Sequence, residues 1–458
     1  GQEYLDVFRR LADSLRALGP LHEVQRLPTP ESYRFDRIEV IGNEVIQDAF
    51  VLGKMRIDPG EAVTIDHIER RIQVIYGTQY FEQIAYEILG EEDHSTLRLI
   101  VEERPSTQLR FAYHYDSDNK GGVLGNITLR NLLLNRSRLI VEGDLATFPS
   151  LHLDYFKYLG KKQNTAFGAS ARYLRNELPA YDSLGNLSLL FASRFSEGAV
   201  KFQSTRVQSS TFGVQAAWSR MNLQPEIADE NLRLLTRIQY NSTTLTAFHY
   251  FDNFNQRYFP TKGFRSRLEV SATPRVNGTV TLLDTLEVDI GELEGLLQRS
   301  DIYALDLSLE PIIPLTRRLS LLAKARLRLS TMEASTLNLH EYDFIGGFVP
   351  GRIDANEYWG GNAKEFVAAN YFYGRIGLQW EVLRNTFLQA QFNYLDTEGL
   401  VTWLYPDADI APLGDRNRRF GYGDLVGIQS PIGPIAFAFA KDHHRPGWQT
   451  SLIVGFFY

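Results

Sequence analysis

An alternation of apolar and polar side chains, sustained over most of the chain, constrains the fold more than any other feature. From Leu109 to Tyr458, runs of the order of ten residues alternate in this way and end at Gly, Asn, Pro or Asp. In one run, Leu305, Leu307 and Leu309 alternate with small or polar residues. Successive side chains of a β-strand point to opposite faces, so each run predicts a strand with one apolar and one polar face.

The length of these runs favours a membrane barrel over a soluble sandwich. Sandwich strands are usually nearer five or six residues long, whereas strands that cross a bilayer need about ten. The roughly 350 residues of this region, at about 22 residues per strand and connection, predict a transmembrane antiparallel β-barrel of about 16 strands. Apolar side chains would then face lipid and polar ones the lumen. A soluble β-sandwich is the alternative, and solubility without detergent would establish it.

Composition narrows the functional classes. The net charge of −7 gives no support to a nucleic-acid partner. The chain has no cysteine, which excludes disulfides, catalytic thiols and thiolate metal sites. No apolar run reaches the roughly 18 residues that a transmembrane helix needs.

No catalytic or metal site stands out in the sequence. It contains no Gly-x-Ser-x-Gly nucleophile elbow. Asp116, Asp118 and Gly121 are spaced as in a calcium loop, but Lys120 occupies a ligand position, so we expect a polar hairpin loop. We therefore expect no enzyme activity, no metal and no cofactor in this chain. A phospholipase domain upstream of residue 1 is left open.

The N-terminal part of the chain has a different pattern. Residues 1–32 predict an amphipathic helix over 2–18 and a linker. Residues 33–106 predict a small α+β domain, and residues 107–458 the barrel. The elements expected in the α+β domain are strands over Arg34–Ile41, Ile84–Leu89 and Thr96–Glu102, and helices over Val45–Met55 and Ile65–Tyr76. Thr64 is the expected N-cap of the second helix.

This α+β domain resembles a POTRA domain. The resemblance rests on Ile38–Asn43, on the turn Pro59-Gly60, and on Gly77 followed by Phe81. It implies a periplasmic module that binds extended polypeptide segments by strand addition at a sheet edge. A generic α+β domain is the alternative.

Three stretches of the barrel region carry a second resemblance. They are Phe254–Gly263 with Arg257, Phe259, Pro260 and Gly263, then Gly421–Pro434, and the closing Leu452–Tyr458 with Phe456 and Tyr458. In this order they resemble the Omp85 superfamily of POTRA-barrel proteins. The resemblance implies a barrel in the bacterial outer membrane, a POTRA domain in the periplasm, and a C-terminal assembly signal at Phe456 and Tyr458. In the first stretch, Pro260 restricts φ and Gly263 supplies a conformation that other residues avoid.

A long segment, Tyr342–Gly361, lies between runs predicted as strands over Leu319–Ser330 and Phe366–Val382. It is rich in glycine and aromatic residues, unlike a simple connection. The resemblance makes it the sixth extracellular loop, which in relatives enters the lumen and places an arginine against the wall. Arg352 would be that arginine, flanked by Gly346 and Gly347. Its candidate partners are Glu381, Asp396 and Glu398, and an exposed loop arginine is the alternative.

The order Pro350-Gly351-Arg352 differs from the Arg-Gly-aromatic order of the assembly-factor branch of this superfamily. With Gly346–Phe348 and Tyr371–Tyr373, the segment is more similar to the barrel part of patatin-like outer-membrane proteins. That resemblance implies a translocation or anchoring module for a patatin-like domain or a passenger polypeptide. A stand-alone transporter or an outer-membrane protein assembly factor is the alternative. The implied partners are outer-membrane lipids, lipopolysaccharide and the assembly machinery of the outer membrane, and a homodimer is left open.

Overall fold

The structure is a computed structural model and describes residues 32–78, 80–91, 94–117, 120–160, 163–181, 187–207, 209–227, 235–274, 276–282, 286–289, 301–332, 338, 340–348, 356–397 and 418–456. The helix predicted over residues 2–18, Arg352, Glu398 and Tyr458 lie outside these residues. The chain divides into two compact units, the first ending at Arg104 and the second running from Pro105 to Tyr458. Neither helix in the described residues is long and apolar enough to cross a membrane.

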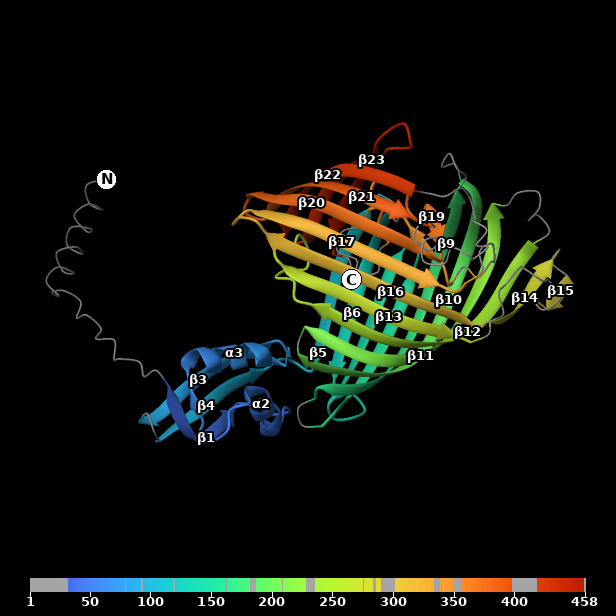
Figure 1. Ribbon diagram of the computed structural model, residues 1–458. Coiled ribbons are helices and arrows are strands. Elements are labelled where there is room, and N and C mark those ends of the chain that lie inside the picture. The colour runs from blue at the N-terminus through green and yellow to red at the C-terminus, as the bar shows by residue number, and fades with distance from the viewer. Residues whose placement is uncertain are drawn as a thin grey trace, which may run out of the picture. The chain divides into compact units, whose positions relative to one another are not determined.

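The first unit is a four-stranded sheet with two helices (Figure 1). The α+β class was predicted, whereas the short strand Ala62–Val63 was not. Its elements are β1 (Tyr33–Ile41), α2 (Asp48–Met55), β2 (Ala62–Val63), α3 (Ile65–Tyr76), β3 (Phe81–Glu91) and β4 (His94–Glu103). The strand order is β2-β1-β4-β3, with β1 and β4 parallel. Thr64 caps α3 by accepting a hydrogen bond from the backbone N–H of His67. Ile68, Ile72 and Ile75 point from α3 into the core.

The first helix is shorter than the sequence pattern predicted. It begins at Asp48 rather than Val45 because Glu103 holds the preceding residues in a turn. The Glu103 carboxylate accepts hydrogen bonds from the backbone N–H groups of Glu44, Val45 and Ile46, at 3.0, 3.1 and 2.7 Å. This contact joins positions far apart in the chain, so local periodicity carries no sign of it.

The second unit is a closed antiparallel barrel, and sixteen strands of the described residues make its wall. The wall strands are β5 (Thr107–Asp116), β6 (Lys120–Arg130), β7 (Ser137–Ala146), β8 (Ser150–Leu159), β9 (Thr165–Tyr181), β10 (Leu187–Val207), β11 (Ser210–Ile227), β12 (Leu235–Asp252), β13 (Gly263–Thr273), β16 (Ile302–Pro314), β17 (Leu319–Ser330), β20 (Tyr371–Leu383), β21 (Thr386–Asp396), β22 (Arg418–Ser430), β23 (Gly433–Asp442) and β24 (Gln449–Gly455). The predicted fold class and strand number are therefore confirmed.

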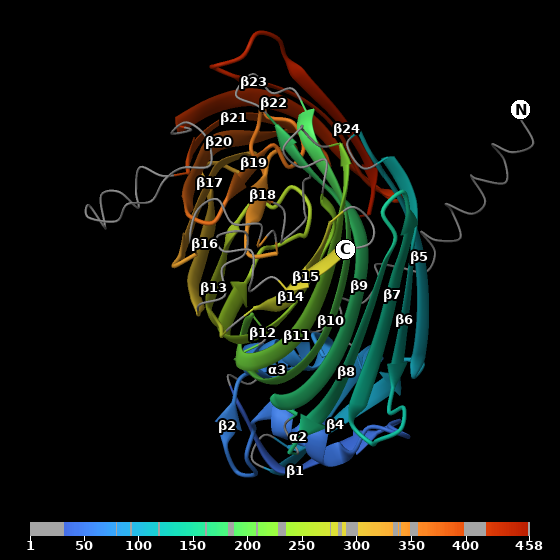
Figure 2. The same cartoon turned by 90° about the vertical axis from the view of Figure 1, so that its right-hand side faces the viewer.

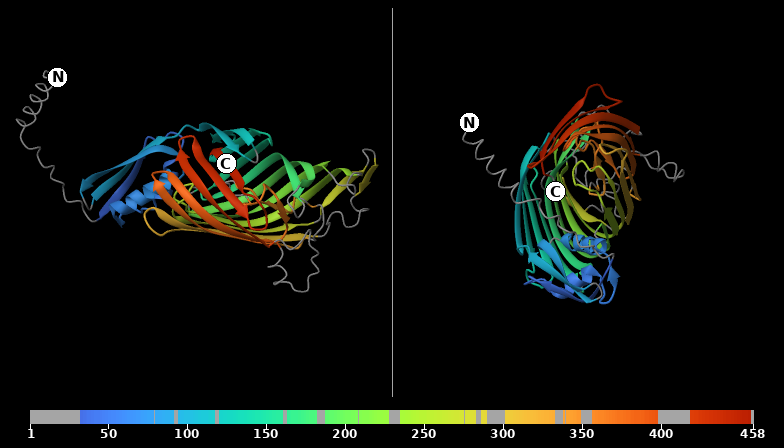
Figure 3. Two further views of the ribbon diagram at one scale, coloured as in Figure 1. Left: turned by 90° about the horizontal axis from the view of Figure 1, so that it is seen from above. Right: turned by 90° about the vertical axis from the view of Figure 1, so that its left-hand side faces the viewer.

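The two rims of the barrel differ in their connections. We call the rim at which β5 begins the near rim and the opposite one the far rim. Tight turns join β20 to β21 and β22 to β23 at the near rim. Longer segments connect strands at the far rim, among them a hairpin of β14 (Asn277–Leu282) and β15 (Leu286–Asp289) that pairs with β12. This hairpin, drawn in yellow, projects past the neighbouring strand ends (Figure 3).

The wall strands present apolar side chains outward and polar ones inward. On β20, Ile376, Leu378 and Trp380 face outward and are about half exposed, at 52%, 45% and 52%. The alternate residues Arg375 and Gln379 face inward and are largely buried. A large apolar outer surface of this kind suits a hydrocarbon surround rather than water.

One local prediction in the barrel was wrong. The run Phe366–Val382 is not one strand, because it breaks after Ala368 and resumes at Tyr371. Asn370 lies in the break and its side chain accepts a hydrogen bond from Ser330 N–H at 2.5 Å.

Candidate functional site

The segment between β17 and β20 lies inside the barrel. Its described residues, 340–348 and 356–370, are here called the inner loop. They form a two-stranded sheet of β18 (Asp343–Ile345) and β19 (Phe366–Ala368), which lies within the ring of wall strands (Figure 2). Tyr358 and Trp359 of the loop are 0% and 1% exposed. The expectation that this segment folds back into the barrel agrees with these positions.

Glu357 joins the inner loop to two wall strands at once. Its carboxylate lies 2.8 Å from Nζ of Lys324 on β17 and 2.8 Å from a guanidinium nitrogen of Arg375 on β20. Arg375 also reaches Glu310 on β16 at 3.1 Å. Burial disfavours the charged form of Glu357, but Arg375 and Lys324 outweigh it and lower the pKa of this loop carboxyl to about 2. Glu357 is therefore ionised at neutral and mildly acidic pH.

Asp343 makes the second ionic contact of the inner loop. Its carboxylate accepts from the Tyr371 hydroxyl at 2.7 Å and lies 3.1 Å from a guanidinium nitrogen of Arg326 on β17. Arg326 also contacts Asp306 on β16 at 2.7 Å and hydrogen-bonds to the side chain of Asn356. These charges are buried, and buried charges persist in proteins only when they are paired in this way.

Close backbone approach fixes the middle of the inner loop. Trp359 donates its backbone N–H to the side-chain oxygen of Asn393 on β21 at 3.0 Å. Gly360 has a φ of +99°, and a Cβ there would lie 2.4 Å from the backbone nitrogen of Asp442 on β23. A Cβ on Gly421 of β22 would lie 2.0 Å from the Trp359 carbonyl oxygen. The loop therefore lies against the wall too closely for side chains at these two glycines.

The returning arm of the inner loop reaches the opposite wall. Lys364 donates to the side chain of Asn176 and to the carbonyl of Glu177, both on β9. Next to it, Glu365 forms a bidentate pair with Arg445 from the β23–β24 connection. The inner loop thus contacts β9, β17, β20, β21, β22 and β23 and spans the lumen.

An apolar cluster connects the inner loop to a near-rim turn. Phe348 and Trp359 of the loop belong to the same buried cluster as Tyr258 and Phe259 from the β12–β13 turn. The Phe259 ring stacks on Phe387 at 5.1 Å. This turn contains the predicted motif residues, and Gly263 has a φ of +126°. Pro260 accepts a hydrogen bond through its carbonyl from Gln379 at 3.0 Å, and exposed Arg257 lies over the Tyr258 ring.

The remaining predicted site residues lie at separate places. Gly346 and Gly347 are in the inner loop with φ of +136° and +75°. Glu381 caps the near-rim turn of β20 and β21 by accepting from Asn385 N–H at 3.1 Å. Asp396 ends β21 and lies 3.4 Å from Arg418. Phe456 follows β24 and donates its backbone N–H to Tyr113 of β5.

The charges that hold the described inner loop have the opposite arrangement to the predicted one. The prediction placed an arginine on the loop and carboxylates on the wall. In the described residues, loop carboxylates meet wall cations, which are Lys324, Arg326 and Arg375. Sequence reasoning missed them, although Lys324, Arg326 and Arg328 alternate with apolar residues on β17, a signal that places all three on the polar face.

The inner loop offers an ionic attachment to the wall. No group of three or more His, Asp or Glu side chains in the described residues could hold a metal ion. The carboxylates of Asp343, Glu357 and Glu365 are paired with cations or hydrogen-bond donors. What this arrangement can do is hold a chain segment across the lumen.

Comparisons with known proteins agree with this architecture. BamA from Haemophilus ducreyi, in a structure lacking POTRA domains 1–3, is similar at a TM-score of 0.62 and 16% identity, covering 93% of this chain and 85% of that one. CdiB from Acinetobacter baumannii has a TM-score of 0.53 at 12% identity, covering 93% and 74%. CdiB from Escherichia coli has a TM-score of 0.53 at 14% identity, covering 93% and 77%. At these identities the likeness concerns the fold alone.

Sequence comparison gives the family. No curated protein matches the sequence. The Omp85 superfamily domain, however, matches residues 149–452, which is more than half of the chain. The chain belongs to the Omp85 superfamily of outer-membrane β-barrels.

Proposed function

We propose that this chain is a translocation or anchoring module for a polypeptide, and that its cargo is a patatin-like domain. The POTRA-like domain lies in the periplasm in this proposal and receives the cargo, while the barrel anchors or passes it. The observation that carries the proposal is the free edge of strand β3. Short turns at the near rim and long connections at the far rim are the usual pattern of periplasmic and extracellular ends, which supports this orientation.

Strand β3 is the edge of its sheet along its whole length. In the described residues it pairs with β4 and with no strand on its other side. The backbone N–H and carbonyl of Ile84 point to that side. There the Tyr76 hydroxyl accepts a hydrogen bond from the N–H at 2.7 Å and donates one to the carbonyl at 3.3 Å. Because backbone direction alternates along a strand, Tyr86 and Ile88 present their backbone groups to the same side. An edge of this length is usually protected, so an open one suits strand addition by a partner.

The plugged barrel suits anchoring as well as passage. The inner loop is attached to six wall strands, and a cargo segment would cross only if these attachments rearranged. An anchor needs no such rearrangement. A stand-alone transporter or assembly factor would use the same free edge, so the nature of the bound polypeptide separates the two functions.

Photo-crosslinking in intact cells tests the proposal. A photoreactive residue at Ala85, on the exposed face of β3, would contact a strand added at the edge. The control position is Thr96 on the same face of β4, which is paired on both sides. We expect the Ala85 variant to capture a patatin-like polypeptide and the Thr96 variant to capture none. Capture of outer-membrane protein precursors would favour the assembly factor, and equal yields at both positions would contradict strand addition.

A further inference from the structure

Three arginines lie together on the outer face of the barrel wall near the far rim. Arg194 on β10 pairs directly opposite Arg175 on β9, and Arg220 on β11 pairs opposite Ser196, the next outward residue of β10. All three are exposed. The alternate residue of β10, Phe195, points into the barrel, where its ring lies 4.6 Å from that of His340 in the inner loop. The arginines therefore point away from the lumen.

The described residues supply these arginines with no ion-paired acid. Among the described residues none of the three forms an ion pair, and Glu177, further along the same face of β9, forms none with them. Side chains at opposite positions of antiparallel strands have Cβ atoms about 5 Å apart, and like charges placed so destabilise the sheet. The pair Arg175 and Arg194 is therefore an unfavourable arrangement for the protein alone. A bound anion would relieve it.

The three arginines, here called the patch, lie at the far-rim end of a band of apolar side chains on the outer face of the barrel. The rows below it toward the near rim contain Gly198, Trp218, Val200, Phe202 and Val214. Ser204 lies near the near-rim end of β10. At the usual rise per residue it is about 33 Å from Arg194 along the strand. At the usual strand tilt this corresponds to about 25 Å along the barrel axis. That distance is close to the apolar height of outer-membrane barrels, which is about 25 Å. The arginines therefore lie at the level of lipid headgroups.

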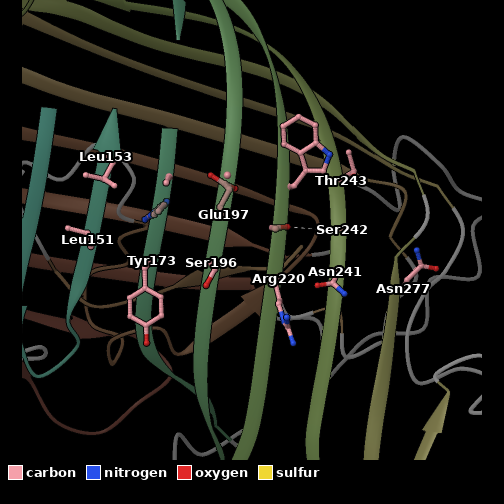
Figure 4. A pocket seen from close by; sticks show the side chains of 15 residues that line it. Leu151, Leu153, Tyr173, Ser196, Glu197, Arg220, Asn241, Ser242, Thr243 and Asn277 are labelled. Carbon is pink, nitrogen blue, oxygen red and sulfur yellow. Dashed lines mark hydrogen bonds between the residues drawn. The ribbon is translucent and has the colours of Figure 1, made fainter. Parts of the chain in front are cut away.

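The wall is hollowed at this boundary. A depression of about 540 Å³ is lined by apolar side chains, among them Leu151, Leu153 and Trp218, and by polar ones, among them Ser196, Arg220 and Asn241 (Figure 4). In Figure 4, Tyr173, Ser196, Arg220 and Asn241 follow one another across four adjacent strands. A ligand that fits this lining has an anionic, hydrogen-bonding head and an apolar body.

With the far rim as the extracellular end, which rests on the proposed function, we propose that this patch binds the phosphorylated headgroup of a glycolipid in the outer leaflet. The guanidinium groups of Arg175, Arg194 and Arg220 bind the phosphates, since this fork of donors matches phosphate oxygens. Ser196 and Asn241 face the sugar hydroxyls, and the acyl chains lie along Trp218 and the apolar rows. A glycolipid suits the site better than a simple phospholipid because several neutral hydrogen-bonding groups, among them Ser196, Asn241 and Asn277, line the depression.

Native mass spectrometry of the full chain in detergent tests the site. The probe is bisphosphorylated lipid A, compared with its dephosphorylated form and with phosphatidylglycerol. We expect the triple variant R175Q/R194Q/R220Q to bind the probe about a hundredfold more weakly, from three lost surface charges. The matched control is R317Q/R318Q/R384Q, which removes the same charge from exposed near-rim turns and should change binding by less than about twofold.

Heat-modifiable migration on gels verifies that each variant is folded. If the triple variant fails to fold, R194Q alone should weaken binding about fivefold, and Trp218→Ala should weaken it through the apolar side. Equal losses in both triple variants, or equal binding of the dephosphorylated lipid, would overturn the proposal. Phosphatidylglycerol binding as tightly as lipid A would also overturn it, because the site would then be a general anionic-lipid surface.

Discussion

Glu357 is the residue through which the inner loop meets two wall strands together. One carboxylate oxygen lies 2.8 Å from both Lys324 and Arg375, and the Glu357 side chain is only 8% exposed. At a buried site, removing one partner of an ion pair destabilises the protein by more than the intact pair stabilises it. The reason is that the remaining charge stays buried without compensation. The energetic importance of Glu357 therefore comes from the two cations that it neutralises.

Replacement of Glu357 by Gln should destabilise the barrel by about 3 kcal/mol. The amide keeps the size of the side chain but removes the counter-charge of Lys324 and leaves Arg375 with Glu310 alone. Urea unfolding in lipid vesicles, followed by tryptophan fluorescence, measures the change in the free energy of unfolding. The matched control is Glu381→Gln at the near-rim turn, where we expect a loss of about 1 kcal/mol or less. A larger effect at Glu381 would contradict the observed wall–loop contacts and favour the partner predicted from sequence.

At the scale of the element, the inner loop is held by shape as well as by charge. Gly360 lies against β23, and Gly421 leaves room for the Trp359 carbonyl. The sequence indicated a loop that docks, because glycines and aromatic residues are recognisable locally. It could not indicate where the loop docks, because the contact of Gly360 with Asp442 depends on the closure of the barrel. The same limit explains why the β17 cations were missed: their polar face is evident from alternation, but their partners in the loop are not.

Gly360 and Gly447 form a matched pair for testing this fit. Their φ values are similar, +99° and +96°, so alanine meets comparable backbone strain at both. A Cβ at Gly360 would lie 2.4 Å from backbone, whereas nothing lies within 4 Å at Gly447. We expect Gly360→Ala to lower the free energy of unfolding by about 1–3 kcal/mol more than Gly447→Ala. It should also speed proteolytic cleavage within the inner loop, and equal effects of the two substitutions would show that the loop does not depend on this approach.

At the scale of the whole molecule, the barrel closes through a ladder that is the shortest between wall strands in the described residues. There, strands β24 and β5 pair at three positions, Ile453 with Asp116, Val454 with Tyr115 and Gly455 with His114, while β22 and β23 pair at ten. Alternation predicted the closed sheet because each strand carries its own pattern. The length of the closing ladder was not predictable, since it depends on the register between the two ends of the chain.

Hydrogen exchange should therefore be uneven around the barrel. Fewer ladder bonds and a short strand give a lower free energy of local opening. We expect amides in peptides covering Gln449–Gly455 to exchange at least about tenfold faster than those covering Gly433–Asp442, as followed by mass spectrometry in detergent. The two peptides are adjacent in the chain and belong to neighbouring strands, so solvent conditions and detergent cover are matched.

The β22–β23 turn at Gly433 should stay protected, because this glycine approaches Gly455 so closely that a Cβ on Gly433 would lie 2.6 Å from the carbonyl carbon of Gly455. Equal protection of the two peptides would mean that contacts beyond the ladder, such as the hydrogen bond from Ser117 N–H to the Leu452 carbonyl at 3.1 Å, make the closure as stable as the rest of the wall.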